Sequence, residues 1–475
     1  MASTLFRTKS IERILADSDA PEHRLKKTLT VWDLTGLGIG AIIGTGIFVL
    51  IGTAIVGDTH RPGAGPGIIL SFMLSGLTCA LAALCYAEFA AMIPVAGSAY
   101  TYSYATLGEL LAWLTGWNLI LEYGVACVAV AIGWSGYFNN ILKLCGVELP
   151  YWATHSPGSE GGIANVPAAL IVLLVTVILV IGVKESARAT CIIVLIKLAV
   201  IVFFIGVGAG AVDKTNWTPF MPFGFDGVGA AAAIVFFAYI GFDAVSTTAE
   251  EARNPQRDLP IGIIVSLFIC TLLYIAVAAV LTGLIPYSKI DVHAPVAEAL
   301  SVTGYRWGAA IVAVGAVAGI TSVLVVMMIG QIRVFFAMSR DGLLGPWLSA
   351  VHPTFRTPHR ATYLTGLAVA VLAAFIPIGD AADMTNIGTL FAFVLVCIGV
   401  IVLRYTKPDQ PRPFKMPLMP VIPLLGMAAC LGLMMFLPAL TWIRFIVWTA
   451  VGIVVYMVYG IRHSRLAAPS PKLPG

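Results

Sequence analysis

Long apolar stretches separated by short polar ones dominate the chain. Stretches of about 18 or more apolar residues recur from the region of residue 31 to that of residue 461. No long hydrophilic insert separates one stretch from the next. A helix needs about 20 such residues to cross the hydrocarbon core of a bilayer. The pattern therefore predicts an all-α polytopic membrane protein.

We expect about twelve transmembrane helices from this pattern. The predicted spans are roughly 31–57, 66–92, 100–142, 164–183, 187–212, 227–249, 260–285, 307–338, 361–378, 384–404, 418–439 and 442–461. The third and eighth are longer than a bilayer requires, so they should tilt or extend beyond it.

The predicted domain organisation is simple. Residues 1–30 form a polar segment without the apolar core of a signal peptide. Residues 31–462 form one transmembrane domain, and residues 463–475 form a Pro-rich tail. No soluble domain is expected.

Composition and charge agree with this picture. The chain is 59% hydrophobic and 11% charged, which excludes a water-soluble protein of this length. If the N-terminus is placed inside, 21 of the 28 lysines and arginines are assigned to inside segments and six to outside segments, and Lys197 is the one left in the membrane. The six that fall outside are Arg61, Lys143, Lys214, Lys289, Arg306 and Arg444. This bias predicts cytoplasmic termini in a plasma-membrane protein, and it explains the net charge of +4 without a nucleic-acid partner.

The sequence gives little indication of a metal site or of an enzyme's active site. The eight cysteines lie almost entirely within spans and form no CxxC pair, so packing is their expected role. The seven histidines lie in tails or loops, so no metal site is indicated. The chain has neither a GxxxxGK nucleotide loop nor a GxSxG elbow, and we do not expect an enzyme or a bound cofactor.

Lys197 interrupts the otherwise apolar run 191–212. Counting from Lys184 at about 1.5 Å per residue places it roughly 20 Å deep, near the bilayer centre. Desolvation at that depth disfavours the ammonium form, and a charge there is a functional candidate. A lysine that can release its proton in mid-membrane could couple a proton gradient to transport. A structural ion pair with Glu122 is the alternative.

Two spans carry helix-breaking sequences. In span one, GAIIGTGIF at 40–48 contains closely spaced glycines, which predict an unwound segment near Ile42 to Gly46 rather than an intact helix packed through its glycines. In span six, FFAYIGFDA at 236–244 places Gly241 and Asp243 in mid-span. Broken backbone at membrane depth is tolerated where it lines a cavity.

The two breaks occupy corresponding positions if spans 1–5 and 6–10 are inverted repeats, at about 31–212 and 227–404, with two further helices at about 418–461. A half-helix N-terminus suits a carboxylate, and unwound carbonyls suit an ammonium group. Together they predict a site for an α-amino acid.

Five segments carry a resemblance to a known family. They are GLGIGAIIGTGIFVL (36–50), YAEFAAMIPVAGSAYTYSYATLGELLAWLTGWNLILEY (86–123), AYIGFDAVSTTAEEARNPQRDLPIGI (238–263), RVFFAMSRDGLLGP (333–346) and RPFKMPLMPVIPLLG (412–426). In these segments the chain resembles the amino acid–polyamine–organocation superfamily, and within it the cationic amino acid transporter family. Twelve spans rather than fourteen make it similar to the bacterial members.

The resemblance implies a five-plus-five inverted-repeat fold, with broken helices one and six, and amino-acid transport by alternating access. The implied substrate site comprises the amides of Gly44, Thr45 and Gly46, the carbonyls of Ile42 or Ile43 and of Phe237, Ala238 and Ile240, an aromatic lid from Phe237 or Tyr239, and Met327 facing the substrate side chain. Lys197 falls where proton-coupled relatives carry a lysine in place of a sodium ion. The resemblance implies that it binds carbonyls of span one and hydroxyls of span eight, with Thr321 and Ser322 the candidates.

One feature departs from the family's preference for arginine and lysine. Met327 is bulky and apolar, which favours small and medium neutral side chains. Glu122 could supply a negative charge, although we expect it to be structural or a second proton site. The partners expected are an amino acid, protons and the bilayer.

Arginine or lysine uptake and amino-acid exchange stay open as alternatives. A sensor or assembly subunit that no longer transports is the alternative of another class. The sequence indicates no protein partner.

Overall fold

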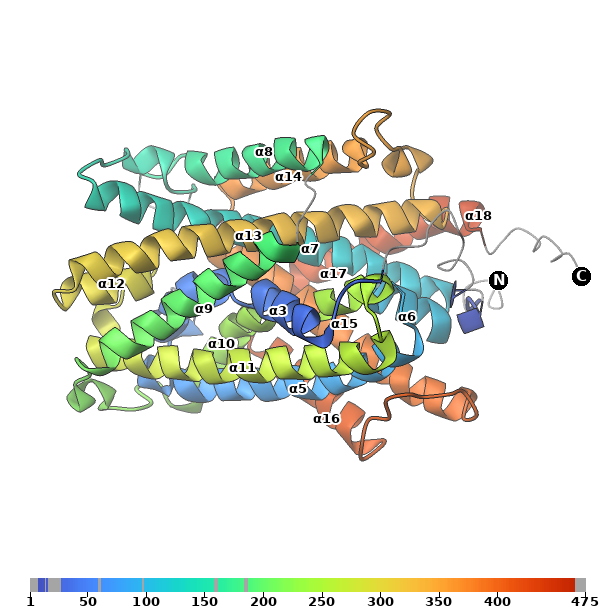
Figure 1. The fold of residues 1–475 in the computed structure, drawn as a ribbon, viewed down its shortest axis with the longest axis horizontal. Helices are drawn as coiled ribbons and strands as arrows, with labels where there is room; N and C mark the ends of the chain where they lie inside the picture. The colour runs from blue at the N-terminus through green and yellow to red at the C-terminus, as the bar shows by residue number, and fades with distance from the viewer. Residues whose placement is uncertain are drawn as a thin grey trace, which may run out of the picture.

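Helices make up most of the described chain (Figure 1). The structure is a computed structural model, and it describes residues 7–12, 14–15, 27–58, 61–95, 98–157, 161–182 and 187–465, without the side chains of 187–191. Lys184, from which the depth of Lys197 was counted, lies outside these residues.

The first half of the chain contains the elements from α3 to α9. Their bounds are α3 Val31–Ile42, η1 Gly46–Leu50, α4 Ile51–Val56, β1 Gly57–Asp58, β2 Arg61–Pro62, η2 Gly65–Gly67, α5 Ile68–Met92, α6 Ser98–Thr106, α7 Glu109–Leu144, η3 Tyr151–Ala153, α8 Val166–Ile181, α9 Ala187–Ala209 and η4 Lys214–Trp217. β1 and β2 form a short antiparallel hairpin.

The second half continues from α10 to α18. Its elements are α10 Gly224–Val235, η5 Phe236–Tyr239, η6 Phe242–Glu251, α11 Pro255–Leu284, η7 Tyr287–Lys289, α12 Pro295–Val302, α13 Arg306–Arg340, η8 Pro346–Ser349, α14 His359–Phe375, α15 Ile378–Thr406, α16 Val421–Met435, α17 Ala439–Val455, η9 Tyr456–Gly460 and α18 Ile461–His463.

These elements supply the membrane spans that the hydropathy pattern predicts. Among the described residues, eight helices are long and apolar enough to cross a bilayer, and α3 with η1 and α4 makes one further span bent by 42°. Three shorter apolar helices, α8, α14 and α16, lie where three further spans are predicted. The all-α polytopic architecture is therefore confirmed.

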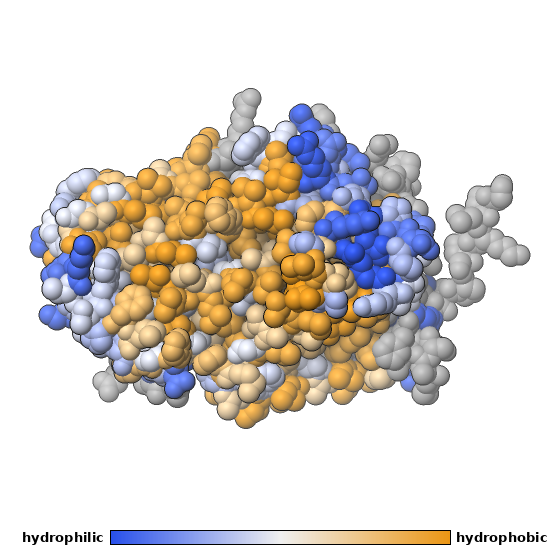
Figure 2. All heavy atoms as spheres, turned by 90° about the horizontal axis from the view of Figure 1, so that it is seen from below, coloured by the Kyte–Doolittle hydropathy of each residue, from blue (hydrophilic) through white to orange (hydrophobic). Residues whose placement is uncertain are grey.

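The apolar surface and the buried centre are clearly separated. On the face seen in Figure 2, orange hydrophobic residues cover the middle of the molecule, and blue residues gather mainly toward one end. Only 22% of the apolar stretch within Ala439–His463 is buried, whereas 94% of the apolar stretch within Gly224–Glu251 is buried. The helix that contains the second break therefore forms the centre of the bundle, and α17 lies at its periphery.

Both predicted breaks are present. α3 ends at Ile42, Ile43 has an extended backbone, and a π-helical turn restarts the helix at Gly46. In the second broken helix, Ile240 is extended and Gly241 has φ +121°, a conformation that L side chains rarely adopt. Gly241 therefore allows the backbone conformation of the second break.

The two breaks lie directly against each other. A Cβ on Gly241 would come within 2.9 Å of the carbonyl carbon of Ala41, and a Cβ on Gly46 would collide with the backbone of Ala238. Each break therefore needs a glycine where it meets the other break, and this close approach brings their free backbone groups into one space.

Span three begins later than predicted. We expected one helix over 100–142, but α6 ends at Thr106 and α7 begins at Glu109. Gly108, with φ +95°, separates them, and the amide of Gly108 donates to the carbonyl of Ser103. The hydropathy pattern missed this turn because a lone glycine gives little local signal.

The first and last described segments meet at the same end of the bundle. The Lys9 ammonium lies 3.8 Å from Asp341 Oδ1, and the amide of Arg465 donates to the Asp341 carbonyl. The Tyr100 hydroxyl also donates to Asp341, at 2.7 Å. Two chain ends on one side agree with an even number of spans.

The segment before α3 is also joined to the segment after η6. The amides of Thr28 and Leu29 donate to the Glu251 carbonyl, and the amide of Arg253 donates to the Leu29 carbonyl. These bonds connect the start of α3 to the end of η6, on the side of the membrane that carries the two chain ends.

Candidate functional site

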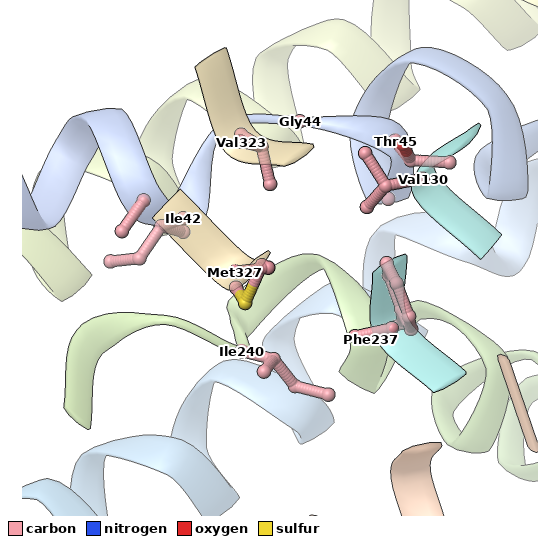
Figure 3. Close-up of a pocket in the computed structure, with 11 residues that line it drawn as sticks. Ile42, Gly44, Thr45, Val130, Phe237, Ile240, Val323 and Met327 are labelled. Carbon is pink, nitrogen blue, oxygen red and sulfur yellow. The ribbon is translucent and has the colours of Figure 1, made fainter. Parts of the chain in front are cut away.

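A small cavity lies between the two breaks (Figure 3). The residues that line it are Ala41, Ile42, Gly44, Thr45, Gly46, Ala126, Val130, Phe237, Ile240, Val323 and Met327. Four separate helices, α3, α7, α10 and α13, contribute to this cavity directly or through the breaks that follow them.

Backbone amides line one side of the cavity. The helix that restarts at Gly46 continues to Val56, and the first N–H groups of a helix have no partner within it. Gly44, Thr45 and Gly46 are at this N-terminus and line the cavity. Free amides and the positive end of the helix dipole suit a carboxylate.

Thr45 adds a hydroxyl to these amides. Its side chain is 1% exposed, and its Oγ1 has no hydrogen-bond partner among the described residues. A Cβ on Gly133 of α7 would come within 3.2 Å of this oxygen, so the glycine leaves room for it. A buried hydroxyl without a partner is costly, and a polar ligand group in the cavity would satisfy it.

The carbonyls of the first break are held from one side by Lys197. Its ammonium donates to the Gly40 carbonyl at 2.7 Å and to the Ile43 carbonyl at 3.1 Å. The side chain is fully buried, and Gly319 of α13 leaves the space that its methylene groups fill. α9 is therefore joined to the unwound segment of α3 through a charged side chain.

Tyr274 of α11 holds the carbonyls of both breaks. Its hydroxyl lies 2.9 Å from the Ile42 carbonyl and 2.9 Å from the Ala238 carbonyl. These are two of the carbonyls predicted to bind a substrate ammonium group. A carbonyl oxygen has two lone pairs, so each can accept a second hydrogen bond.

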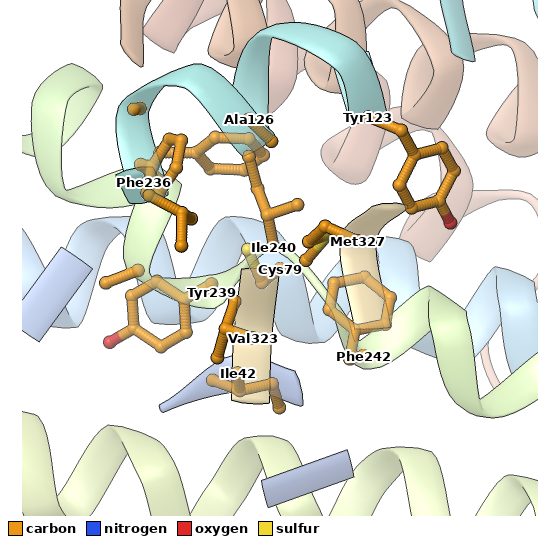
Figure 4. Close-up of a cluster of buried hydrophobic side chains, with 14 of the residues drawn as sticks. Ile42, Cys79, Tyr123, Ala126, Phe236, Tyr239, Ile240, Phe242, Val323 and Met327 are labelled. Atoms are coloured by element: carbon orange, nitrogen blue, oxygen red, sulfur yellow. The ribbon is translucent and has the colours of Figure 1, made fainter. Parts of the chain in front are cut away.

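Apolar side chains form the remaining wall. Ile240, Val323 and Met327 gather at the centre of a larger hydrophobic cluster (Figure 4). Met327 and Val323 lie one turn apart on α13, and Ala126 and Val130 lie one turn apart on α7. A ligand side chain in this part of the cavity meets only hydrocarbon and a thioether.

Comparison with known proteins agrees with this geometry. The family model described as "Amino acid permease" matches residues 29–461. The chain belongs to the amino acid permease family. It is an amino-acid transporter of the membrane and not an enzyme.

Curated relatives match the permease over most of its length. A methylthioribose transporter of Bacillus subtilis (strain 168) is 51% identical over 465 residues, covering 98% of this chain and 99% of that protein. The branched-chain amino acid permease BcaP of the same organism is 50% identical over 470 residues, covering 98% and 100%. The vacuolar cationic amino acid transporter 4 of Arabidopsis thaliana is 39% identical over 417 residues, covering 86% and 68%. The resemblance to the cationic amino acid transporters is thus confirmed.

Most of the predicted site residues of the permease lie at the cavity. Ile42, Gly44, Thr45, Gly46 and Met327 line it. Phe237 and Ile240 line it from the second break. The Ile43 carbonyl accepts from Lys197, and the Ile42 carbonyl accepts from Tyr274.

Tyr239 lies differently from Phe237. Its hydroxyl donates to the Phe72 carbonyl at 2.8 Å, and its ring packs against Phe72 and Tyr274. Phe237, rather than Tyr239, is therefore the aromatic residue at the cavity.

The two hydroxyls proposed as partners of Lys197 bond elsewhere. Thr321 donates to the Val317 carbonyl and accepts from the Trp134 indole, and Ser322 donates to the Gly319 carbonyl. Within the described part of the permease neither bonds the ammonium. Both hydroxyls bond within their own helix because the i−3 and i−4 carbonyls are always within reach.

Glu122 is buried but does not pair with Lys197 among the described residues. Its ionisable neighbour is Asp243 of the second broken helix, whose carboxyl group accepts from the Tyr123 hydroxyl at 3.0 Å. Lys197 and Glu122 therefore belong to separate polar groups in the permease.

Several cavity residues were not predicted from the sequence. Val323 lies one helical turn before Met327, and helical spacing alone could have suggested it. Ala41 precedes the predicted unwound segment directly. Ala126 and Val130 of α7 carry no local signal, because apolar helices place residues of these types on every face. The same is true of Tyr274 of α11, which is not among the residues that line the cavity but bonds carbonyls of both breaks.

Proposed function

We propose that the permease is a proton-coupled symporter of small and medium neutral L-amino acids. The observation that carries the coupling proposal is the position of Lys197, whose ammonium bonds two carbonyls of the first break. The amino-acid site lies at the same break, so a change at Lys197 acts on backbone that the substrate uses.

The charge of Lys197 controls the strength of this junction. Hydrogen bonds from an ionised donor are roughly twice as strong as those between neutral groups. Loss of the proton therefore weakens the connection of α9 to the unwound segment, and reprotonation restores it. An energy difference of about 1.4 kcal/mol between the two states shifts a conformational equilibrium tenfold.

The same geometry supports H⁺ rather than Na⁺ as the coupling ion. The ammonium places a positive charge against the carbonyls of Gly40 and Ile43. Unwound carbonyls are the groups that hold a sodium ion in transporters with broken helices. A charged lysine in this position makes a second cation there unfavourable, and no cofactor is needed.

The cavity wall supports the substrate range. Met327, Val323, Ile240 and Val130 offer no acceptor for the charged end of an arginine or lysine side chain. An unpaired charge in such surroundings is costly. Neutral aliphatic side chains fit this wall, and the likeness to a branched-chain amino acid permease supports the same range.

Methylthioribose is a second candidate substrate. The likeness to a methylthioribose transporter at 51% identity favours it, and the apolar wall suits its methylthio group. A sugar has no carboxylate to bind the amides at Gly44 to Gly46, so the amino acid uses more of the observed site.

Orientation and location are part of the proposal. The lysine and arginine bias supports a plasma-membrane protein with both chain ends in the cytoplasm. Import then begins from the side that carries the β1–β2 hairpin.

Uptake by the purified permease in liposomes tests coupling. We expect labelled alanine to accumulate when an inward proton gradient is imposed, to be insensitive to sodium, and to stop accumulating with a protonophore. Lys197→Ala should abolish accumulation and retain measurable binding. Accumulation by Lys197→Ala to the wild-type level would remove Lys197 from the coupling mechanism, and Glu122 would become the next candidate.

The same liposomes separate the other functions. Exchange without coupling predicts uptake only when an amino acid is present inside, independent of the proton gradient. A sensor that does not transport predicts binding without uptake.

Competition against labelled alanine tests the substrate range. Neutral amino acids should compete best, and arginine, lysine and methylthioribose should compete poorly. If arginine and lysine compete best, the interpretation of Met327 is wrong. If methylthioribose competes best, the second candidate substrate replaces the first.

A further inference from the structure

Tyr274 occupies a position between the two broken helices that the transport function alone does not explain. Its side chain is fully buried on α11. Its hydroxyl oxygen lies 2.9 Å from the Ile42 carbonyl oxygen of the first break and 2.9 Å from the Ala238 carbonyl oxygen of the second.

A tyrosine hydroxyl has one hydrogen to donate, whereas two carbonyls converge on it. At any moment one carbonyl receives the hydrogen, or both share it weakly. Two carbonyl oxygens aimed at one point in apolar surroundings need a donor, because an unsatisfied buried polar group is costly. A substrate ammonium group brings three further donors to the same carbonyls.

The ring of Tyr274 is held firmly in place. Its centroid lies 5.4 Å from that of Phe72 on α5 and 5.4 Å from that of Tyr239 in η5. The Tyr239 hydroxyl in turn donates to the Phe72 carbonyl. The position of the Tyr274 hydroxyl is therefore set by packing against α5 and η5 and does not depend on a substrate.

Tyr274 and Lys197 hold the same short stretch of backbone. Lys197 bonds the carbonyls of Gly40 and Ile43, and Tyr274 bonds the carbonyl of Ile42 between them. The unwound segment is thus held by one side chain from α9 and one from α11. A shift of this segment when Lys197 changes charge must change the bond from Tyr274 to Ile42.

We propose that Tyr274 is a positioning residue that sets the spacing of the two breaks and transmits the state of Lys197 from the first break to Ala238 in the second. The first role concerns substrate binding alone. The second role rests on the proposed proton coupling.

The surroundings contain few other titratable groups. Cys270, one turn before Tyr274 on α11, is near both Tyr274 and Lys197, and Tyr239 of η5 is near Tyr274. The contacts from α3, α5 and α13 at this point are backbone carbonyls, Phe72 and the glycine at 319. Cys270→Ser is therefore a useful background in which to repeat pH measurements.

Tyr274→Phe is the decisive variant because it removes the hydroxyl and keeps the packing of the ring. We expect KM for alanine to rise about fivefold to tenfold, the equivalent of one lost hydrogen bond. We expect alanine–alanine exchange at equal pH to persist, while stimulation by an inward proton gradient is largely lost.

Tyr456→Phe is the matched control. The Tyr456 hydroxyl is also buried and donates at 2.9 Å, but to Glu109 and far from the breaks. It should lower thermal stability and leave KM and the pH profile of transport unchanged. A purely structural role for Tyr274 predicts the same behaviour for Tyr274→Phe.

The outcomes separate the two roles. A wild-type KM in Tyr274→Phe overturns the positioning role, whether or not protons drive transport. A raised KM with full gradient stimulation overturns transmission and leaves positioning in place. If wild-type transport itself ignores the proton gradient, the proposed coupling has failed, and the KM comparison still decides positioning.

A second variant provides a test if Tyr274→Phe fails to fold. 3-Fluorotyrosine at position 274 keeps the ring and hydroxyl and makes the hydroxyl a stronger donor. A changed KM supports the positioning role, and an unchanged KM overturns it.

Discussion

The ammonium of Lys197 lies 2.7 Å from the carbonyl oxygen of Gly40, five residues before Thr45, the N-cap of the helix that restarts at Gly46. Gly40 is still within α3, but its carbonyl has no amide partner in the helix, because α3 ends before an amide four residues later can bond it. The Lys197 ammonium therefore supplies the hydrogen bond that an amide of the next helical turn would have supplied. A helix broken for substrate binding leaves acceptors that another helix must satisfy.

The hydroxyls of Thr321 and Ser322 should matter little for coupling, because they bond carbonyls of their own helix. We expect Ser322→Ala and Thr321→Val to retain uptake driven by a proton gradient. Thr321→Val should lower stability by about 1–3 kcal/mol because it leaves the Trp134 indole without its acceptor. Uptake into liposomes by these two variants is measured in parallel with uptake by Lys197→Ala. Loss of accumulation as complete as in Lys197→Ala would place these hydroxyls in the coupling mechanism.

Gly46→Val should abolish amino-acid binding, because its side chain would meet the backbone of Ala238 and force the breaks apart. Gly44→Ala should be milder, since the added methyl group meets the Val323 side chain at 2.9 Å. Binding to purified protein, measured beside thermal stability, distinguishes a lost site from a lost fold. Amino-acid amides should fail to compete, because they lack the carboxylate that the amides at this break suit.

Gly36→Ala is the matched control for these glycine variants. No atom outside its own helix lies within 4 Å of the position of its Cβ. Alanine is favoured over glycine in a helix by about 1 kcal/mol, so stability should rise slightly with binding unchanged. Unchanged affinity in a folded Gly46→Val variant would remove this break from the carboxylate site.

The parts of the fold that sequence could predict are those with a local signal. Hydropathy located the spans, and the density of glycines from Gly36 to Gly46 located the first break. Gly241 beside Asp243 indicated the second break, because glycine and a charge in mid-span are both unusual. Gly108 was missed because a lone glycine at the edge of an apolar run is common.

The contacts between helices could not be read from the pattern. Tyr274 bonds Ile42 across 232 residues, and Arg61 bonds Asp383 across 322 residues. Nothing next to these residues indicates a partner. The resemblance implied Thr321 and Ser322 as partners of Lys197, and in the structure both hydroxyls donate to carbonyls of their own helix.

The ion pair between Arg61 and Asp383 should be a large contributor to stability at the hairpin end. Arg61 Nη2 lies 2.9 Å from Asp383 Oδ2, and both side chains are nearly inaccessible. Asp383→Asn should lower the free energy of unfolding by about 3–5 kcal/mol, because it leaves a buried charge poorly paired. Asp58, 3.0 Å from Arg61 Nε, reduces the loss. Chemical or thermal unfolding in detergent measures the effect.

Two comparisons sharpen this prediction. Arg61→Met with Asp383→Leu should recover much of the loss, since both charges leave together. Asp380→Asn removes an ion pair in which the side chain of Arg444 is 37% exposed and that of Asp380 is 42% exposed. It should therefore lower the free energy of unfolding by less than about 1 kcal/mol. Equal losses from Asp380→Asn and Asp383→Asn would show that burial does not determine the effect.

His155 should make the permease sensitive to acid. Burial and the neighbouring ring of His293 lower the pKa of His155 below its ordinary value of 6.5. The folded protein then binds fewer protons than the unfolded chain, so stability is present above pH 6.5 and falls as pH drops below it. His155→Gln should flatten the decline of Tm between about pH 6.5 and pH 5, and both proteins should share one Tm dependence above pH 7. An identical decline in the variant would assign the acid sensitivity to other groups.

Cys145 offers a native probe of orientation. It follows α7 directly and is exposed, whereas the other described free cysteines are buried. The lysine and arginine bias places this loop outside. A membrane-impermeant maleimide should therefore label the permease in intact cells, and Cys145→Ser should remove that labelling. A Cys191→Ser background removes the cysteine whose side chain is not described.

A cysteine on the opposite side completes the orientation test. Thr354, in the exposed loop before α14, is predicted to be inside, so Thr354→Cys in a Cys145→Ser background should react only after the cells are opened. The reverse pattern, with Thr354→Cys labelled in intact cells and Cys145 protected, would invert the topology. Import would then have to begin from the side where Lys9 and Arg465 meet Asp341.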